Sequence, residues 1–140
     1  MKVKLLHTTG NRDIIESIWD KPEPAKDEIE VKTVLTGLCS SDVAMYDGKF
    51  TTLPKEIQGH ESIGIVSKVG SLVQANTGLK EGDVVATRGE PGFADYYNSR
   101  MGTFVKVPKA EPKYIVEPVA CGINVANAVY NHSDNKEQSI

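Results

Sequence analysis

The chain has 140 residues, of which 39% are hydrophobic and 25% are charged, and its formal net charge is −3. This length and composition predict one globular domain with a substantial core. Because no segment is dominated by lysine and arginine, the broad positive surface that nucleic acid requires is not expected. No stretch approaches the roughly 18 uninterrupted apolar residues of a membrane span, and the first ten residues lack the apolar core of a secretory signal. We therefore expect a cytoplasmic protein that binds neither nucleic acid nor a membrane.

Short strands separated by turns dominate the predicted elements. The clearest strand begins at Glu28, where the alternation of side chains places Ile29 and Val31 on one face and Glu30 and Lys32 on the other. Two helices are expected, at residues 40–47 and 118–130, and the polar segment 131–139 is typical of a surface loop or a domain linker. This pattern predicts a mainly β fold, a small antiparallel barrel or sandwich. In chain order, the predicted strands are residues 1–6, 14–19, 28–35, 62–69, 83–87, 93–98 and 103–107.

Glycine spacing excludes one class of binding site. Among the 12 glycines no two are separated by a single residue, so the Gly-x-Gly core of a dinucleotide fingerprint is absent. Any nucleotide would have to be bound by a surface outside these residues.

Reactive side chains gather at the ends of two predicted strands. Cys39 follows one strand, and His60 and Glu61 precede another. Thiolate, imidazole and carboxylate are ligand types that zinc accepts, and three of them leave a fourth position open for water or substrate. Taken singly, Cys39 is more often a buried free thiol, His60 a hydrogen-bonded loop residue and Glu61 a solvated carboxylate, and spacing alone does not favour a zinc site over these interpretations.

Longer strings around these residues resemble the zinc-dependent medium-chain dehydrogenases of the alcohol, sorbitol and threonine dehydrogenase type. The resemblance covers nearly the whole chain, but only as the amino-terminal catalytic domain of that family, and it implies a GroES-like small β-barrel over residues 1–140. Its segments are Gly37-Leu38-Cys39-Ser40-Ser41-Asp42, Gly59-His60-Glu61-Ser62-Ile63-Gly64, Leu79-Lys80-Glu81-Gly82-Asp83-Val84-Val85, Gly92-Phe93-Ala94-Asp95-Tyr96 and Glu117-Pro118-Val119-Ala120-Cys121-Gly122.

The resemblance also implies roles for individual residues. Cys39, His60 and Glu61 would bind one catalytic zinc, together with Glu117. Cys121 is the alternative to Glu117, and an acidic residue before Pro118 is also what a helix start favours.

Three neighbours of Cys39 take the remaining roles that the resemblance implies. Ser41 would take the proton of the substrate hydroxyl, Asp42 would orient His60, and Ser40 would contact the cofactor. The family's relay histidine is replaced by Ala44. The family's lobe of four cysteines is missing, so no structural zinc is expected.

Two functions from different classes follow. The first is the catalytic part of a zinc- and NAD- or NADP-dependent alcohol or polyol dehydrogenase, an oxidoreductase whose nicotinamide cofactor binds only through a Rossmann domain that is missing here and would pack on the barrel. On this hypothesis the isolated chain is inactive. The alternative is a stand-alone GroES-like module that binds a metal or a protein without enzymatic activity.

Overall fold

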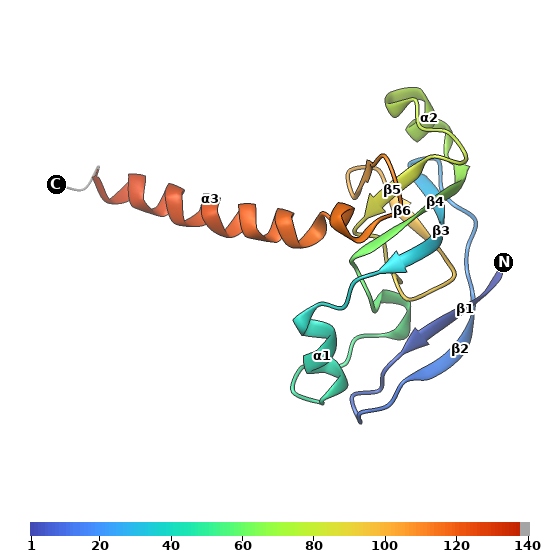
Figure 1. The fold of residues 1–140 in the computed structure, drawn as a ribbon, viewed down its shortest axis with the longest axis horizontal. Coiled ribbons are helices and arrows are strands. Elements are labelled where there is room, and N and C mark those ends of the chain that lie inside the picture. The colour runs from blue at the N-terminus through green and yellow to red at the C-terminus, as the bar shows by residue number, and fades with distance from the viewer. Residues whose placement is uncertain (138–140) are drawn as a thin grey trace.

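A computed structural model of the chain describes residues 1–137 and contains two antiparallel sheets (Figure 1). The smaller sheet is a hairpin of β1 (Lys2–His7) and β2 (Ile15–Asp20). The larger sheet has the order β6-β3-β4-β5-β7 and comprises β3 (Glu28–Thr36), β4 (Ser62–Val69), β5 (Val84–Thr87), β6 (Tyr96–Arg100) and β7 (Phe104–Lys106). Most predicted strands are therefore confirmed, and the fold is mainly β as expected.

The segment that precedes β6 joins the two sheets. On one side, the N–H of Leu6 donates to the Phe93 carbonyl at 3.0 Å and the N–H of Asp95 donates to the Lys4 carbonyl at 2.9 Å. On the other side, the N–H of Thr33 in β3 donates to the Asp95 carbonyl at 2.9 Å. Since these bonds satisfy backbone groups of both sheets, the hairpin is held against the end of the larger sheet that carries the reactive residues.

A buried ion pair ties β2 to the larger sheet. Lys21 follows β2, and its ammonium lies 2.7 Å from the Glu30 carboxylate, with both side chains almost fully buried. The same ammonium donates to the carbonyl of Pro22 and to Oδ1 of Asn98, each at 2.8 Å. Ser67 donates to the other Glu30 oxygen at 2.9 Å. Glu30 is thus buried although Lys32, two residues later, is exposed, and the Glu30 charge is matched by Lys21.

Three helices lie outside the sheets in the described part of the chain. The predicted first helix is confirmed as α1 (Ser40–Tyr46). A second, α2 (Ser71–Thr77), was not predicted; its ends are marked by glycines, Gly70 as N-cap and Gly78 in the left-handed region as C-cap. Its Val73 is fully buried in the core, so tertiary packing stabilises a helix that is too short to form alone.

The third helix, α3 (Glu117–Glu137), projects away from the sheets (Figure 1). The prediction of a loop or linker at 131–139 was wrong for residues 131–137, which continue the helix; 138–139 lie outside the described residues. After Gly122 the helix contains neither glycine nor proline, and each residue added to a formed helix gains a hydrogen bond at low cost. Among residues 1–137, no helix combines the length and apolar character needed to cross a bilayer.

Candidate metal centre

The pairing of β3 with β4 brings the candidate ligands together. Thr36, the last residue of β3, pairs with Ser62, the first residue of β4. Because the strands are antiparallel, the segment after β3 and the segment before β4 lie at the same edge of the sheet. The N–H of Gly37 donates to the Glu61 carbonyl at 2.7 Å and fixes this approach. Cys39 and His60 therefore become neighbours although they are 21 positions apart in the sequence.

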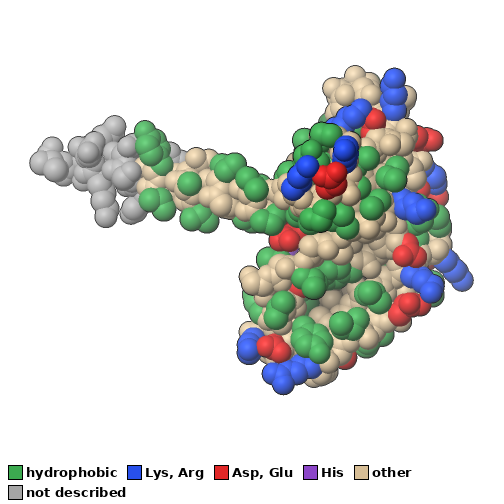
Figure 2. Space-filling model, in the orientation of Figure 1, with side chains coloured by type: hydrophobic (Ala, Val, Ile, Leu, Met, Phe, Trp, Pro, Cys, Tyr) green, Lys and Arg blue, Asp and Glu red, His purple; other side chains and the backbone are tan. Residues whose placement is uncertain are grey.

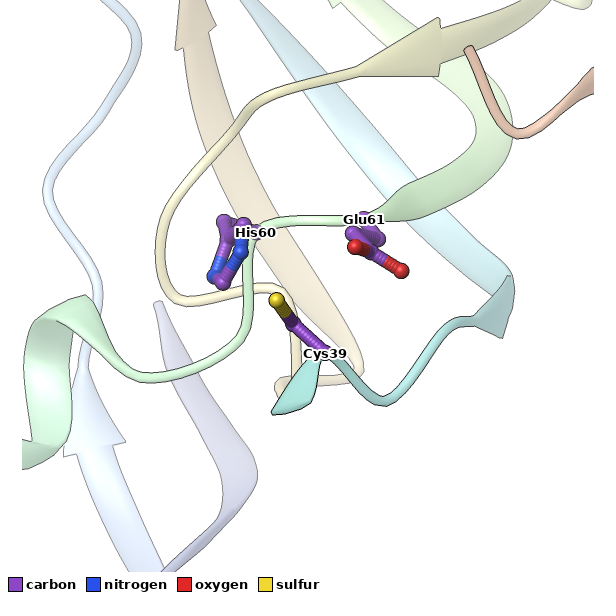
Figure 3. A group of neighbouring side chains, drawn as sticks. All are labelled: Cys39, His60 and Glu61. Carbon is purple, nitrogen blue, oxygen red and sulfur yellow. The ribbon is translucent and has the colours of Figure 1, made fainter. Parts of the chain in front are cut away.

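Cys39, His60 and Glu61 point toward a common space (Figure 3). The Cys39 sulfur, a ring nitrogen of His60 and a carboxylate oxygen of Glu61 all lie within 4.8 Å of one another. Donor atoms around a tetrahedral zinc ion lie about 3.5 Å apart, so small side-chain rotations suffice to close the group around an ion. Among the residues whose side chains the structure describes, this is the one group of three or more such ligands.

Hydrogen bonding favours the thiolate form of Cys39. The hydroxyl and the backbone N–H of Ser41 donate to the sulfur and lower the pKa of the thiol below its usual value, and His60 and Ser40 add to the effect against partial burial. Cys39 also stands at the N-cap of α1, where the helix dipole favours a negative charge. A metal-binding cysteine must be deprotonated, and its surroundings meet that requirement.

His60 is surrounded by acidic neighbours. Burial acts to lower its pKa, but the hydrogen bond with Cys39 and the charges of Asp42, Cys39 and Glu117 outweigh it, so the pKa of His60 lies above its ordinary value. Excess negative charge around a half-buried imidazole is the electrostatic environment that a divalent cation would neutralise.

The Glu61 carboxylate occupies a space that only glycine leaves free. Its side chain is 7% exposed, and burial together with the charge of Glu117 raises its pKa. A Cβ atom at Gly37 would collide with a Glu61 carboxylate oxygen. The backbone at the end of β3 thus shapes the position of the third donor.

The three neighbours of Cys39 lie at the start of α1. Asp42 is buried, and its Oδ2 accepts a hydrogen bond from the Cys39 N–H at 2.9 Å. It therefore holds the cysteine loop, and its charge reaches His60. Ser41 faces the site through its bonds to the Cys39 sulfur, whereas Ser40 is exposed at the first turn.

Glu117 and Cys121 lie one turn apart at the start of α3. The Cys121 thiol donates to Glu117 Oε1 at 3.0 Å, and this bond raises the pKa of the exposed thiol. Glu117 is close enough for its charge to raise the pKa values of His60 and Glu61, yet it is not a member of the three-residue group. The predicted ligand therefore borders the site without closing it.

Sequence reasoning missed the residues that support the group from behind. Gly59 has a positive φ of 79°, and a Cβ there would meet the ring of Phe93. Phe93 thus packs directly on the backbone next to His60. The sequence did contain a signal, because Gly37 lies two residues before Cys39 and Gly59 directly before His60. A glycine, however, does not reveal which side chain fills the space that it leaves.

The match to known proteins agrees with this arrangement. The model of the alcohol dehydrogenase GroES-like domain matches residues 25–117. The chain belongs to the alcohol dehydrogenase GroES-like domain family. The predicted resemblance and the GroES-like fold class are thereby confirmed. The matched segment includes Cys39, His60, Glu61 and Glu117.

Curated relatives and solved structures extend the comparison. The chain is 42% identical over 81 residues to D-xylulose reductase A of Aspergillus niger, covering 53% of this chain and 21% of the relative. It is 38% identical over 87 residues to an alcohol dehydrogenase of Moraxella sp. (strain TAE123), covering 61% and 25%. This chain therefore spans about a fifth to a quarter of the length of these two relatives.

The solved structures are less similar in sequence and show the fold alone. One, assigned as a zinc-binding dehydrogenase from Sinorhizobium meliloti 1021 and bound to NADP, has a TM-score of 0.72 at 20% identity and covers 91% of this chain and 46% of its own. Another is 2R,3R-butanediol dehydrogenase from Bacillus subtilis, with a TM-score of 0.67 at 20% identity, covering 83% and 44%.

Proposed function

We propose that this chain is the zinc-binding catalytic part of an alcohol or polyol dehydrogenase that uses NAD or NADP. The observation that carries the proposal is the convergence of Cys39, His60 and Glu61 within 4.8 Å at one sheet edge. The donor set suits zinc, because thiolate, imidazole and carboxylate are its usual protein ligands. Family membership and the alcohol and xylulose specificities named for the relatives support the substrate class.

Each residue of the site has a part in this proposal. Cys39, His60 and Glu61 hold one zinc ion. Glu117, at the edge of the site, is the candidate for a further carboxylate ligand. A zinc ion bound there supplies Lewis-acid polarisation of a hydroxyl or carbonyl oxygen. Ser41, which hydrogen-bonds to the Cys39 sulfur, would accept the hydroxyl proton of the substrate and pass its own proton on to water. A bound nicotinamide would supply the hydride acceptor.

Two further residues act through position. The Asp42 carboxylate accepts a hydrogen bond from the Cys39 N–H and places negative charge near His60, which keeps both ligands oriented. Ser40, exposed at the start of α1, is assigned to contact with the cofactor. Residues 1–140 form the zinc-binding domain, and a Rossmann domain outside these residues supplies the nicotinamide site and packs on the barrel.

Metal analysis of the purified chain tests this proposal. We expect one zinc per chain, lost in Cys39→Ser and retained in Cys121→Ser, because Cys121 lies outside the three-residue group. A stand-alone module that binds a partner protein needs no metal at all. Absence of zinc from the wild-type chain would therefore favour that second function.

Activity of the chain by itself provides a separate test. Since the glycine fingerprint for a dinucleotide is absent from the sequence, the 140 residues alone should show no dehydrogenase activity. The measurement is NADH or NADPH formation with primary and secondary alcohols and polyols. Alcohol-dependent reduction by the isolated chain would overturn the assignment of the cofactor site to another domain.

A further inference from the structure

A pocket of about 390 Å³ lies between the β1–β2 hairpin and α1. Leu6 and Ile14 line it from the hairpin side, Val43 and Met45 from α1, and Phe93 from the segment that joins the sheets. Figure 2 shows hydrophobic side chains gathered on this lower part of the molecule. None of the three candidate metal ligands lines the pocket, although Asp42, which accepts the Cys39 N–H, is one of its lining residues.

Two polar side chains at the wall of the pocket, Gln58 and His7, are engaged within the protein. The Gln58 carbonyl oxygen accepts from the Thr8 N–H at 2.8 Å, and its amide nitrogen donates to the carbonyls of Thr8 and Leu53 at 3.0 and 2.8 Å. A ring nitrogen of His7 is hydrogen-bonded to Ser17 at 2.9 Å. A ligand therefore meets a mainly apolar wall, to which Tyr46, with its hydroxyl, also contributes.

Four large apolar side chains at the pocket remain in contact with water. Leu6 is 47% exposed, Ile14 72%, Leu38 74% and Val43 53%. Each Å² of such surface removed from water contributes about 25 cal/mol, so an apolar occupant would be stabilised by covering them. The carboxylate at the wall is that of Asp42, and its negative charge disfavours an anion.

We propose that this pocket is a binding site for an uncharged apolar small molecule. A dry cavity of about 150 Å³ accommodates benzene, so the larger volume found here suits a molecule of about ten carbon atoms, such as an alkylbenzene. The proposal rests on the lining of this pocket and not on the proposed dehydrogenase activity. The pocket should select ligands that are uncharged and apolar.

Titration of the full chain with n-butylbenzene tests the proposal. The control ligand is 4-butylbenzoate, which has the same butylphenyl group and adds a negatively charged carboxylate. We expect saturable NMR shifts and intermolecular NOEs from butylbenzene to the methyl groups of Ile14, Val43 and Met45, and at least about tenfold weaker binding of the carboxylate because its charge must be desolvated beside Asp42. Equal affinity of the two compounds, or no saturable binding of butylbenzene, would overturn the proposal.

A pair of hairpin variants locates the site. Ile14→Asp places a carboxylate at the pocket and should weaken butylbenzene binding about tenfold or more, whereas Ile18→Asp, exposed on β2 but outside the pocket, should leave it unchanged. Both side chains are exposed, so both variants should fold, which circular dichroism checks. Equal effects of the two variants would place binding elsewhere. Concentration-dependent shifts at the pocket without ligand would instead assign it to a second copy of the chain.

Discussion

Replacing Lys21 by methionine should destabilise the fold severely. The ammonium lies 2.7 Å from the Glu30 carboxylate, and neither side chain is meaningfully exposed. Methionine keeps the apolar stem but leaves a buried carboxylate whose remaining strong partner is Ser67. Breaking such a pair by removing one member costs about 3–5 kcal/mol, against a total stability of about 5–15 kcal/mol for a typical domain.

Urea unfolding followed by circular dichroism measures this loss, and an exposed ion pair serves as control. Lys4 pairs with Glu16 at 3.1 Å across the hairpin, with more than half of each side chain exposed. Lys4→Met should therefore change the free energy of unfolding far less than Lys21→Met. The double variant Lys21→Met with Glu30→Leu should recover most of the stability, since it removes the unpaired charge.

The pH dependence follows from Glu30. In the wild type, burial would raise its pKa, but hydrogen bonds and charge from Lys21, Ser67 and Lys68 leave the pKa below its ordinary value. The lowered pKa of Glu30 stabilises the fold at pH values above the pKa that Glu30 has in the unfolded chain. This stabilisation is lost as the pH falls through the pKa of Glu30 in the folded protein. Without Lys21, the buried charged carboxylate of Glu30 destabilises the fold at neutral pH. The difference in free energy of unfolding between the wild type and Lys21→Met should therefore become smaller from pH 7 toward pH 4. A Lys21→Met loss no larger than that of Lys4→Met would refute the reasoning.

Two further substitutions test the site and the core. Gly37→Ala places a Cβ against the Glu61 carboxylate and should weaken zinc binding about tenfold or more. The affinity is measured by competition with a chromophoric chelator. Gly122→Ala is the control, because its added Cβ meets no neighbour and should leave zinc binding unchanged. Burial raises the pKa of Tyr97 to about 12, so wild-type stability should fall as the pH rises from about 10 to 12. Tyr97→Phe removes the hydrogen bond to Thr87 and should lower the free energy of unfolding by about 1 kcal/mol at neutral pH. Its stability should not fall between about pH 10 and 12 as that of the wild type does. An unchanged fall in this variant would contradict the assignment of the alkaline titration to Tyr97.

Alternation and turn residues were sufficient to predict most of the strands. Period-two patterns, proline at 22 and 24, and glycine after β4 mark boundaries that depend on local chemistry. Two helical segments were missed for different reasons. Helix α2 is stabilised by the burial of Val73 in the core, and residues 131–137 extend a helix that begins elsewhere; neither effect is visible in the local sequence.

The candidate site was predictable as a set of residues but not as an arrangement. The ligand types and their family strings singled out Cys39, His60 and Glu61, and the pairing of β3 with β4 brings them together. Asp42 was expected to orient His60, and this role stays a prediction. In the structure its carboxylate accepts the Cys39 N–H, a contact that depends on the turn into α1. Likewise, the buried position of Glu30 depends on Lys21, and the alternation of side chains in β3 does not reveal that pairing.

Zinc stoichiometry of the purified chain tests the central proposal most directly. Elemental analysis after exhaustive dialysis should find one zinc per chain in the wild type and in Cys121→Ser, and none in Cys39→Ser. Zinc retained in Cys39→Ser, or a metal-free wild type that does not take up added zinc, would contradict the proposed metal centre of Cys39, His60 and Glu61.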